Sequence, residues 1–270
     1  MSRSCFKKMI YDVLKSFEEH LLNTYSEETS NTYYKRLCSL FDGQNLLNTV
    51  KNLDTDKILY KLGQIKYKNH FSQSKNAFLH FCEFQNIELS GDVLENIKAL
   101  EKSTVKKYKK LATIEYKEVD KTIKHIKNPK LKLCYQVLIT TGLRVSELAS
   151  ITANDCVIDG DVITLSFIGK GGKTEAVTII AEENPALFQR LKEHVKNTSS
   201  ENADNVKRKV FYSAVYLQTK AKELGFKCHD LRRIFAKLEY KKHSKKEVMK
   251  KMRHSNIKTT NIYIRSKVKF

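Results

Sequence analysis

The sequence predicts a mainly helical protein with one small β-hairpin or sheet, of the α+β class, and its 270 residues are enough for two domains. Two observations predict this class. Apolar residues recur at three- and four-residue steps through most of the chain, which is typical of amphipathic helices. Around residues 161–180, apolar and polar residues instead alternate and β-branched side chains are frequent, which is typical of strands.

The first ninety residues predict a small helical bundle. The helical spacing runs through residues 9–22, 30–41, 54–65 and 71–84. Aromatic and basic side chains interleave on these segments, which suits either a DNA-contacting face or an ordinary solvated face. We therefore expect one helical domain over residues 1–89. The looser pattern of residues 90–111 ends in the run KKYKK, and we expect a basic linker there.

Residues 112–270 predict a second domain, mostly helical, with a hairpin inserted. Helical spacing is found at 115–126, 129–142 and 144–151, and resumes from 184–195 to the end of the chain. The two strands of the hairpin are expected at 161–167 and 174–180.

The loop of this hairpin, GKGGKT, has the composition of a phosphate-binding loop. A nucleotide-binding P-loop would need a glycine at Phe167 and a helix after Thr174, and the sequence provides neither. We therefore expect a hairpin tip that carries Lys170 and Lys173, with Lys170 between two glycines.

The charge of the chain predicts a polyanionic partner. Lys and Arg number 50 against 30 Asp and Glu, which gives a formal net charge of +20. A lysine-rich composition of the source organism would produce part of the same excess. No apolar run is long enough for a signal peptide or a membrane span, so we expect a cytoplasmic, nucleoid-associated protein without a membrane partner. Six scattered cysteines lack metal-binding spacing and indicate a reducing compartment.

Four motifs along the second domain carry candidate catalytic residues. They are TGLRVSEL with Arg144, the hairpin with Lys170, HDLR with His229 and Arg232, and a last segment in which His254 precedes Tyr263 by nine residues. Each residue alone fits a bland role, such as a helix salt bridge, a solvated turn or a packing aromatic. Taken together and in this order, the set resembles the tyrosine recombinase (phage integrase and Xer-like) family.

The resemblance implies a helical core-binding (SAM-like) DNA-binding domain over 1–89 and a catalytic domain over 112–270. It implies a site-specific recombinase that cleaves and rejoins DNA through a covalent 3′-phosphotyrosine, with no metal and no other cofactor. The implied partners are double-stranded DNA recombination sites, bound by a homo-tetramer on synapsed DNA. Tyr263 would be the nucleophile, Arg144 and Arg232 would stabilise the phosphate charge, and Lys170 would be the general acid. His229 would be the base, and His254 would donate a hydrogen bond to the phosphate.

Two positions depart from the pattern of this family. Arg253 stands where a glycine usually precedes the second histidine, and Arg233 stands where a histidine often follows the second arginine. Other functions also fit the sequence. A type IB topoisomerase or a telomere resolvase would use similar residues. A non-catalytic DNA-binding regulator would use residues 244–264 as a helix-turn-helix.

Overall fold

A computed structural model of the chain describes residues 3–41, 54–105, 113–169, 172–200 and 208–270. The chain divides into two units, Met1–Lys109 and Lys110–Phe270, and each unit has its own apolar core. Helices predominate and the strands are few and short, so the predicted fold class is confirmed.

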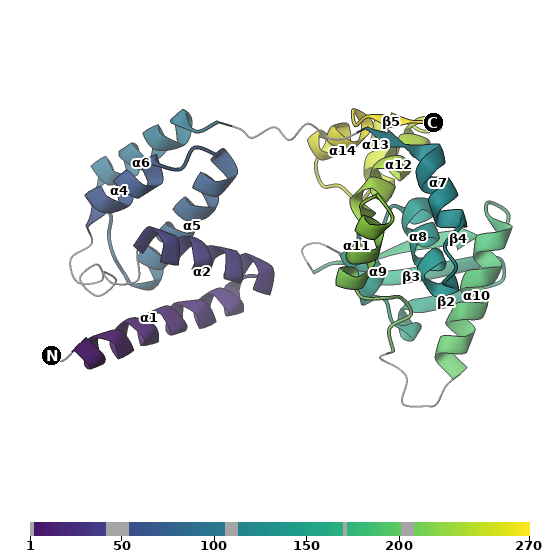
Figure 1. Cartoon of the computed structure of the whole chain (residues 1–270), viewed down its shortest axis with the longest axis horizontal. Coiled ribbons are helices and arrows are strands. Elements are labelled where there is room, and N and C mark those ends of the chain that lie inside the picture. The colour runs from purple at the N-terminus through teal and green to yellow at the C-terminus, as the bar shows by residue number, and fades with distance from the viewer. Residues whose placement is uncertain (1–2, 42–53, 106–112, 170–171, 201–207) are drawn as a thin grey trace. The chain divides into compact units, whose positions relative to one another are not determined.

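The N-terminal unit is a helical bundle whose apolar faces meet in one core (Figure 1). Its described helices are α1 (Arg3–Thr24), α2 (Glu27–Phe41), α4 (Thr55–Gly63), α5 (Lys68–Phe84) and α6 (Gly91–Ser103). Aromatic side chains spaced along α5 fill the centre, where Phe71, Phe78 and Phe81 are fully buried. The helices predicted within the first ninety residues are therefore present, with small shifts at their ends.

Helix α6 lies where the sequence predicted part of a linker. Ser90 caps its first turn by accepting a hydrogen bond from the backbone N–H of Val93. One apolar side chain, Ile97, is buried in the core of the N-terminal unit, and α6 packs against α4 and α5. Because that apolar stripe is narrow and flanked by charged residues, its period was hard to distinguish from a loose linker. The lysine run 106–110 lies outside the described residues.

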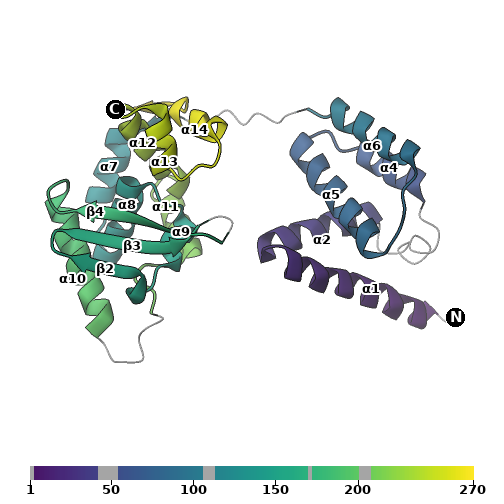
Figure 2. The ribbon, with the colours of Figure 1, turned by 180° about the vertical axis from the view of Figure 1, so that it is seen from behind.

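The C-terminal unit combines a three-stranded sheet with a layer of helices (Figures 1 and 2). Before and within the sheet come β1 (Ile114–Glu115), α7 (Tyr116–Lys124), α8 (Pro129–Thr141), α9 (Val145–Ser150), a 3₁₀ turn (Ala153–Asp155), β2 (Cys156–Asp159), β3 (Val162–Ile168) and β4 (Thr174–Ile180). After it come α10 (Pro185–Ser200), α11 (Ala214–Glu223), α12 (Cys228–Tyr240), α13 (Lys245–Lys251), α14 (Ile257–Ile264) and β5 (Val268–Lys269).

The sheet is antiparallel with the order β2-β3-β4, and it contains the predicted hairpin. On β3 the side chains of Ile163, Leu165 and Phe167 point to one face and are buried, as a period of two requires. The helices cover that face, and the opposite face is open in Figure 2. The hairpin register pairs Phe167 with Glu175. This register brings a carboxylate to the base of the loop that holds Lys170.

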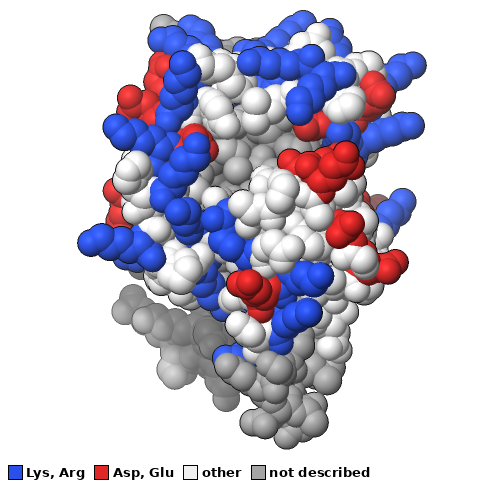
Figure 3. Space-filling model, turned by 90° about the vertical axis from the view of Figure 1, so that its right-hand side faces the viewer, with Lys and Arg blue, Asp and Glu red and all other residues white. Residues whose placement is uncertain are grey.

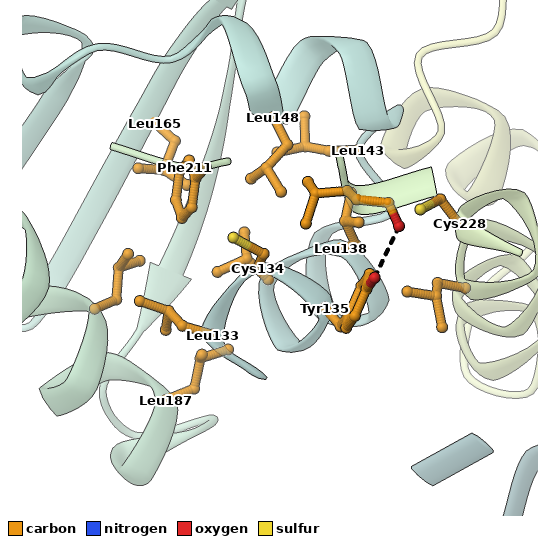
Figure 4. Close-up of a cluster of buried hydrophobic side chains, with 14 of the residues drawn as sticks. Leu133, Cys134, Tyr135, Leu138, Leu143, Leu148, Leu165, Leu187, Phe211 and Cys228 are labelled. Atoms are coloured by element: carbon orange, nitrogen blue, oxygen red, sulfur yellow. Dashed lines mark hydrogen bonds between the residues drawn. The ribbon is translucent and has the colours of Figure 1, made fainter. Parts of the chain in front are cut away.

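The core of the C-terminal unit joins the sheet to α8 and α12 (Figure 4). One buried polar group within it, the hydroxyl of Tyr135, donates a hydrogen bond to the carbonyl of Leu217 at 2.8 Å. This bond satisfies the hydroxyl, so the aromatic ring can remain in the apolar interior. The packed core fixes the ends of α8, α9 and α12 relative to one another, and three candidate catalytic residues, Arg144, His229 and Arg232, lie at those ends.

A second, two-stranded sheet joins the first and last strands of this unit. Strand β5 runs parallel to β1, with Val268 opposite Ile114 and Lys269 opposite Glu115. The Nζ of Lys269 lies 3.0 Å from a carboxylate oxygen of Glu115. This pairing ties the segment that follows α14 to the beginning of the same unit.

Candidate active site

The turn after α8 positions Arg144. Gly142 ends α8 in the left-handed region, at φ 62°, and a Cβ atom at this position would overlap the ring of Phe235. Arg144 follows as the N-cap of α9, and its backbone N–H donates to Oε2 of Glu147 at 2.7 Å. Its guanidinium Nη1 pairs with Oε1 of Glu147 at 2.5 Å. About one third of the Arg144 side chain (34%) remains exposed, so one side of the guanidinium is open to a ligand.

Arg232 on α12 is almost completely buried, with 1% exposure. Its Nη1 donates to the carbonyl of Gly142, and its Nη2 donates to the carbonyl of Met252 at 2.5 Å. Its Nε has no hydrogen-bond partner among the described residues. Burial and the charge of Arg144 lower the pKa of Arg232 to about 10. A buried cation without a directly paired carboxylate is costly, so this site favours an anionic ligand.

His254, in the turn between α13 and α14, is buried beside Arg232. Its Nε2 lies 3.2 Å from Nη2 of Arg232, and its Nδ1 lies 3.0 Å from Oγ1 of Thr260. Because a guanidinium can only donate, Nε2 accepts and the ring proton is on Nδ1. Burial and the charge of Arg232 lower the pKa of His254 to about 4. The ring is therefore neutral at pH 7.

Tyr263 on α14 packs against both histidine rings. The ring centroid of His229 is 5.2 Å from that of Tyr263, and the His254 centroid is 5.1 Å away. The Cζ atom of Arg232 lies 5.9 Å from the Tyr263 ring centroid. Loss of water around the ring and the charge of Arg232 lower the pKa of His229 below its ordinary value. A neutral His229 beside the phenol is able to accept its proton.

A cleft of about 550 Å³ opens beside these residues. Arg144, His229 and Arg232 line it together with two further cations, Lys222 and Lys227. The cleft therefore presents positive charge next to Tyr263 and His254, which do not line it but lie against His229 and Arg232, which do. Positive charge is not confined to it, since Figure 3 shows Lys and Arg side chains spread over another face, with Asp and Glu among them.

The structure brings together five of the six residues that the sequence selected: Arg144, His229, Arg232, His254 and Tyr263. The sixth, Lys170, lies outside the described residues. The strands on either side of it pair up to Ile168 and Thr174, and the N–H of Gly169 donates to the carbonyl of Lys173 at 2.8 Å. The loop that carries Lys170 is thus closed at its base where the alternation predicted.

Sequence reasoning missed three supporting residues. Glu147 pairs with Arg144, Thr260 accepts from His254, and Glu175 lies near Arg253. Only Glu147 had a local signal, because it stands three residues after Arg144 in the first turn of a helix. The other two contacts join segments that the sequence gives no reason to place together.

The described residues contain neither a membrane-spanning helix nor a metal-binding cluster of side chains. None of the described helices is both long and apolar enough to cross a bilayer. Within the described ranges, no group of three or more His, Cys, Asp and Glu side chains is arranged to hold a metal ion.

The sequence is similar to that of known proteins. The model of the phage integrase family matches residues 112–269. The tyrosine recombinase XerA of Saccharolobus solfataricus is 28% identical over 165 residues, which cover 57% of this chain and 52% of that protein, so the chain spans about half the length of this curated relative.

Solved structures share the fold. The XerH site-specific recombinase bound to difH substrate has a TM-score of 0.60 at 20% identity, over 87% of this chain and 76% of that one. A lambda integrase dimer bound to a COC′ core site has a TM-score of 0.59 at 16% identity, over 94% of each chain.

Proposed function

The chain belongs to the phage integrase family, and from that membership we propose that it is a site-specific DNA recombinase. It cleaves and rejoins DNA strands through a covalent 3′-phosphotyrosine. One observation carries this proposal: a phenol and two histidines pack around the buried guanidinium of Arg232, which lines a cationic cleft together with Arg144 and His229. These are the groups that phosphodiester transfer needs when tyrosine is the nucleophile.

The proposed reaction begins with attack of the Tyr263 oxygen on the scissile phosphorus. The phenol proton passes to His229, whose lowered pKa leaves it neutral and able to accept. As the oxygen–phosphorus bond forms, the bond from phosphorus to the 5′-oxygen breaks. Lys170 gives a proton to that departing oxygen. Attack by a 5′-hydroxyl reverses these steps and releases the tyrosine.

The two arginines stabilise the charge of the pentacoordinate phosphate. A guanidinium stays protonated and its N–H groups fork onto phosphate oxygens, so no metal is needed for this purpose. Arg144 has an open side toward the cleft, and the buried Nε of Arg232 lacks a partner among the described residues. Both features favour a bound phosphate.

His254 would change its hydrogen bonding when the phosphate binds. With no ligand, its Nε2 accepts from Arg232 and has no proton to donate. A phosphate gives Arg232 a better acceptor, which frees Nε2. The hydroxyl of Thr260 can then donate to Nδ1, since a hydroxyl both donates and accepts, and the ring proton moves to Nε2 to face a phosphate oxygen. We therefore propose His254 as a donor only in the DNA complex.

Double-stranded DNA recombination sites are the proposed partner, bound by a homo-tetramer on synapsed DNA. The net charge of +20 and the lysines of the cleft favour a polyanion. We assign the N-terminal unit to core binding and residues 112–270 to catalysis, in a cytoplasmic, nucleoid-associated protein. Helices α13 and α14 carry His254 and Tyr263 toward Arg232, which supports a catalytic rather than a purely DNA-reading role for this pair.

Trapping of a covalent adduct tests the proposal. The full chain is incubated in EDTA with a library of nicked duplexes, because the short strand beyond the nick diffuses away and prevents religation. We expect an adduct that survives denaturation and requires neither metal nor nucleotide. A chain that forms no adduct with any duplex, or forms one only with Mg²⁺, is not a tyrosine recombinase.

A further inference from the structure

Arg253 occupies a backbone conformation that favours glycine. It lies in the turn after α13 at φ 53°, in the left-handed region, where a bulky side chain is strained. The only other described non-glycine residue with positive φ is Asn86, a residue type that tolerates this region. The strain at Arg253 persists only where its surroundings hold it, so the contacts of its side chain are informative.

The side chain of Arg253 contacts three separate segments. Its side chain is mostly buried, with 11% exposed. Toward α9 and its preceding turn, Nη2 donates to the carbonyl of Gly142 at 3.3 Å and lies 3.7 Å from Oε2 of Glu147. Toward the hairpin, Nε lies 3.5 Å from Oε2 of Glu175, and Cζ lies 5.4 Å from the ring centroid of Phe167. In its own turn, Nη1 donates to the carbonyl of Lys251 at 2.9 Å.

On the hairpin side, Arg253 neutralises a carboxylate that touches the catalytic loop. A Cβ atom on Gly169 would lie 2.8 Å from the carboxyl carbon of Glu175, so this carboxylate packs directly against the residue that precedes Lys170. Oε2 of Glu175 is buried, and among the described residues it has no hydrogen bond. About 29% of the Glu175 side chain stays exposed, and among the described residues the ion pair with Arg253 offsets the burial of this oxygen.

On the α9 side, Arg253 shares the carboxylate that holds Arg144. Glu147 is 5% exposed; its Oε1 pairs with the guanidinium of Arg144, and its Oε2, which accepts from the Arg144 backbone N–H, lies 3.7 Å from Nη2 of Arg253. The charge of Arg253 near Glu147 weakens the electrostatic attraction between Glu147 and Arg144. The positive charge of Arg144 is then less neutralised and can attract a phosphate more strongly.

We propose that Arg253 is a positioning residue that fixes the base of the β3–β4 hairpin, at Gly169 and Glu175, against α9 and the turn that carries Arg144. This inference rests on the proposed function for its catalytic consequence. Its structural consequence, a hairpin anchored through Glu175, does not depend on activity.

The first measurement compares Arg253→Gly with the wild-type full chain by amide hydrogen exchange. Glycine relieves the strained backbone and removes every side-chain contact. We expect exchange of the Gly169 amide, which closes the loop, to become about tenfold faster. Asn86→Gly, the same change at the same φ in the other unit, should leave it unchanged. Unchanged exchange in Arg253→Gly would overturn the proposal whether or not the protein cleaves DNA.

The second measurement is single-turnover cleavage of a nicked duplex on which the wild type forms its adduct. Arg253→Gly should cleave about 10- to 100-fold more slowly, as expected for misplaced catalytic groups, with affinity for the duplex changed less than about threefold. Arg253→Lys should recover part of the loss, because it keeps the charge without the fork. The double variant Arg253→Gly, Glu175→Gln should cleave no more slowly than the slower single variant. Each substitution by itself already removes the ion pair between Arg253 and Glu175.

Other results are expected if Arg253 only stabilises the fold or has no role in cleavage. If Arg253→Gly cleaves as fast as the wild type, the residue has no positioning role. If Arg253→Gly and Arg253→Asn, both suited to positive φ, unfold or lose DNA binding, the role is general stability and the proposal is wrong. Failure of the wild type itself to form an adduct contradicts the proposed function, and the hydrogen-exchange result then decides the anchoring on its own.

Discussion

Among the described residues, the interior of the N-terminal unit is almost entirely apolar, whereas that of the C-terminal unit contains charged side chains. Ser30 and Ser74 are the buried polar residues of the first unit. In the second unit Arg232, His254 and Glu147 are all less than 10% exposed. The interior of the bundle thus gains its stability mainly from apolar burial. The C-terminal unit keeps buried charge that is only partly compensated, which is the expected cost of a site prepared for an anion.

The largest effect is expected from loss of Lys170 in the hairpin loop. Its substitution should slow the chemical step of cleavage and leave the packed interiors of both units unchanged. Lys170→Ala should slow cleavage by roughly 10²–10⁴, the usual loss for a missing proton donor. A substrate with sulfur in place of the bridging 5′-oxygen needs no such proton, since a thiol has a pKa near ~8.5. Single-turnover rates on this substrate should recover most of the loss in Lys170→Ala.

Two controls keep that result specific. Arg144→Ala loses charge stabilisation and should recover much less with sulfur. Lys173→Ala should show only a modest defect on either substrate. If sulfur rescues Lys173→Ala while Lys170→Ala has no defect, the general acid is three residues further along the loop.

Gly142→Ala should lower the unfolding free energy of the C-terminal unit and leave that of the N-terminal unit unchanged. The added Cβ overlaps the ring of Phe235, and φ 62° is strained for alanine. Overpacking and backbone strain together should cost about 2–5 kcal/mol of unfolding free energy. The shift would also displace the carbonyl that accepts from Arg232 and Arg253.

Urea unfolding monitored separately in each unit measures this effect. Gly91→Ala is the matched control, since Gly91 has no atom within 4 Å of an added Cβ. It should change stability by less than about 1 kcal/mol. Equal destabilisation by the two variants would mean that the turn at Gly142 is not specially constrained.

Acid should weaken the C-terminal unit through His254. Its folded pKa is about 4, below the ordinary value of about 6.5 in the unfolded chain. The unfolded state therefore binds the proton first, and the stabilising contribution, complete above pH 6.5, is lost as the pH falls toward 4. The loss attributable to this residue should be about 3 kcal/mol. Unfolding free energies between pH 7 and 4 should show a shallower decline in His254→Gln, and parallel declines would contradict the lowered pKa of His254.

The smallest expected effect concerns the cations at the rim of the cleft. Lys222 and Lys227 line it without contacting Tyr263, so each should serve DNA phosphates only. Lys222→Ala should reduce the slope of log affinity against log salt by about 1 and leave the cleavage rate of bound DNA unchanged. Lys117→Ala, which removes an exposed charge of the C-terminal unit that does not line the cleft, is a useful reference. A cleavage defect at saturating DNA would move Lys222 into the reaction.

Local pattern predicted the fold best where structure is local. The alternation at 161–167 and 174–180 matches β3 and β4 almost residue for residue, because period-two burial is visible in the strand itself. The β1–β5 pair was missed because its strands have two residues each and come from opposite ends of the unit. Helix α6 was missed because a single residue, Ile97, is fully buried in it.

In the candidate site, too, local features were predictable from sequence and contacts between distant segments were not. Resemblance to a family selected the residues that converge, since their motifs are short and local. Their relations were not predictable from sequence: that Nε2 of His254 accepts from Arg232, or that Arg253 reaches the hairpin, depends on contacts between distant segments. Arg253 was visible only as a departure from the family's glycine, with no indication of its partners.

Mapping the site of covalent attachment tests most directly the claim that buried charge in the C-terminal unit serves tyrosyl transfer. The adduct formed in EDTA is digested, and the peptide that carries the nucleotide is sequenced by mass spectrometry. We predict attachment at Tyr263, with Tyr263→Phe binding the same duplex with nearly wild-type affinity and forming no adduct. Attachment at another tyrosine such as Tyr240, or adducts that persist in Tyr263→Phe, would contradict the account.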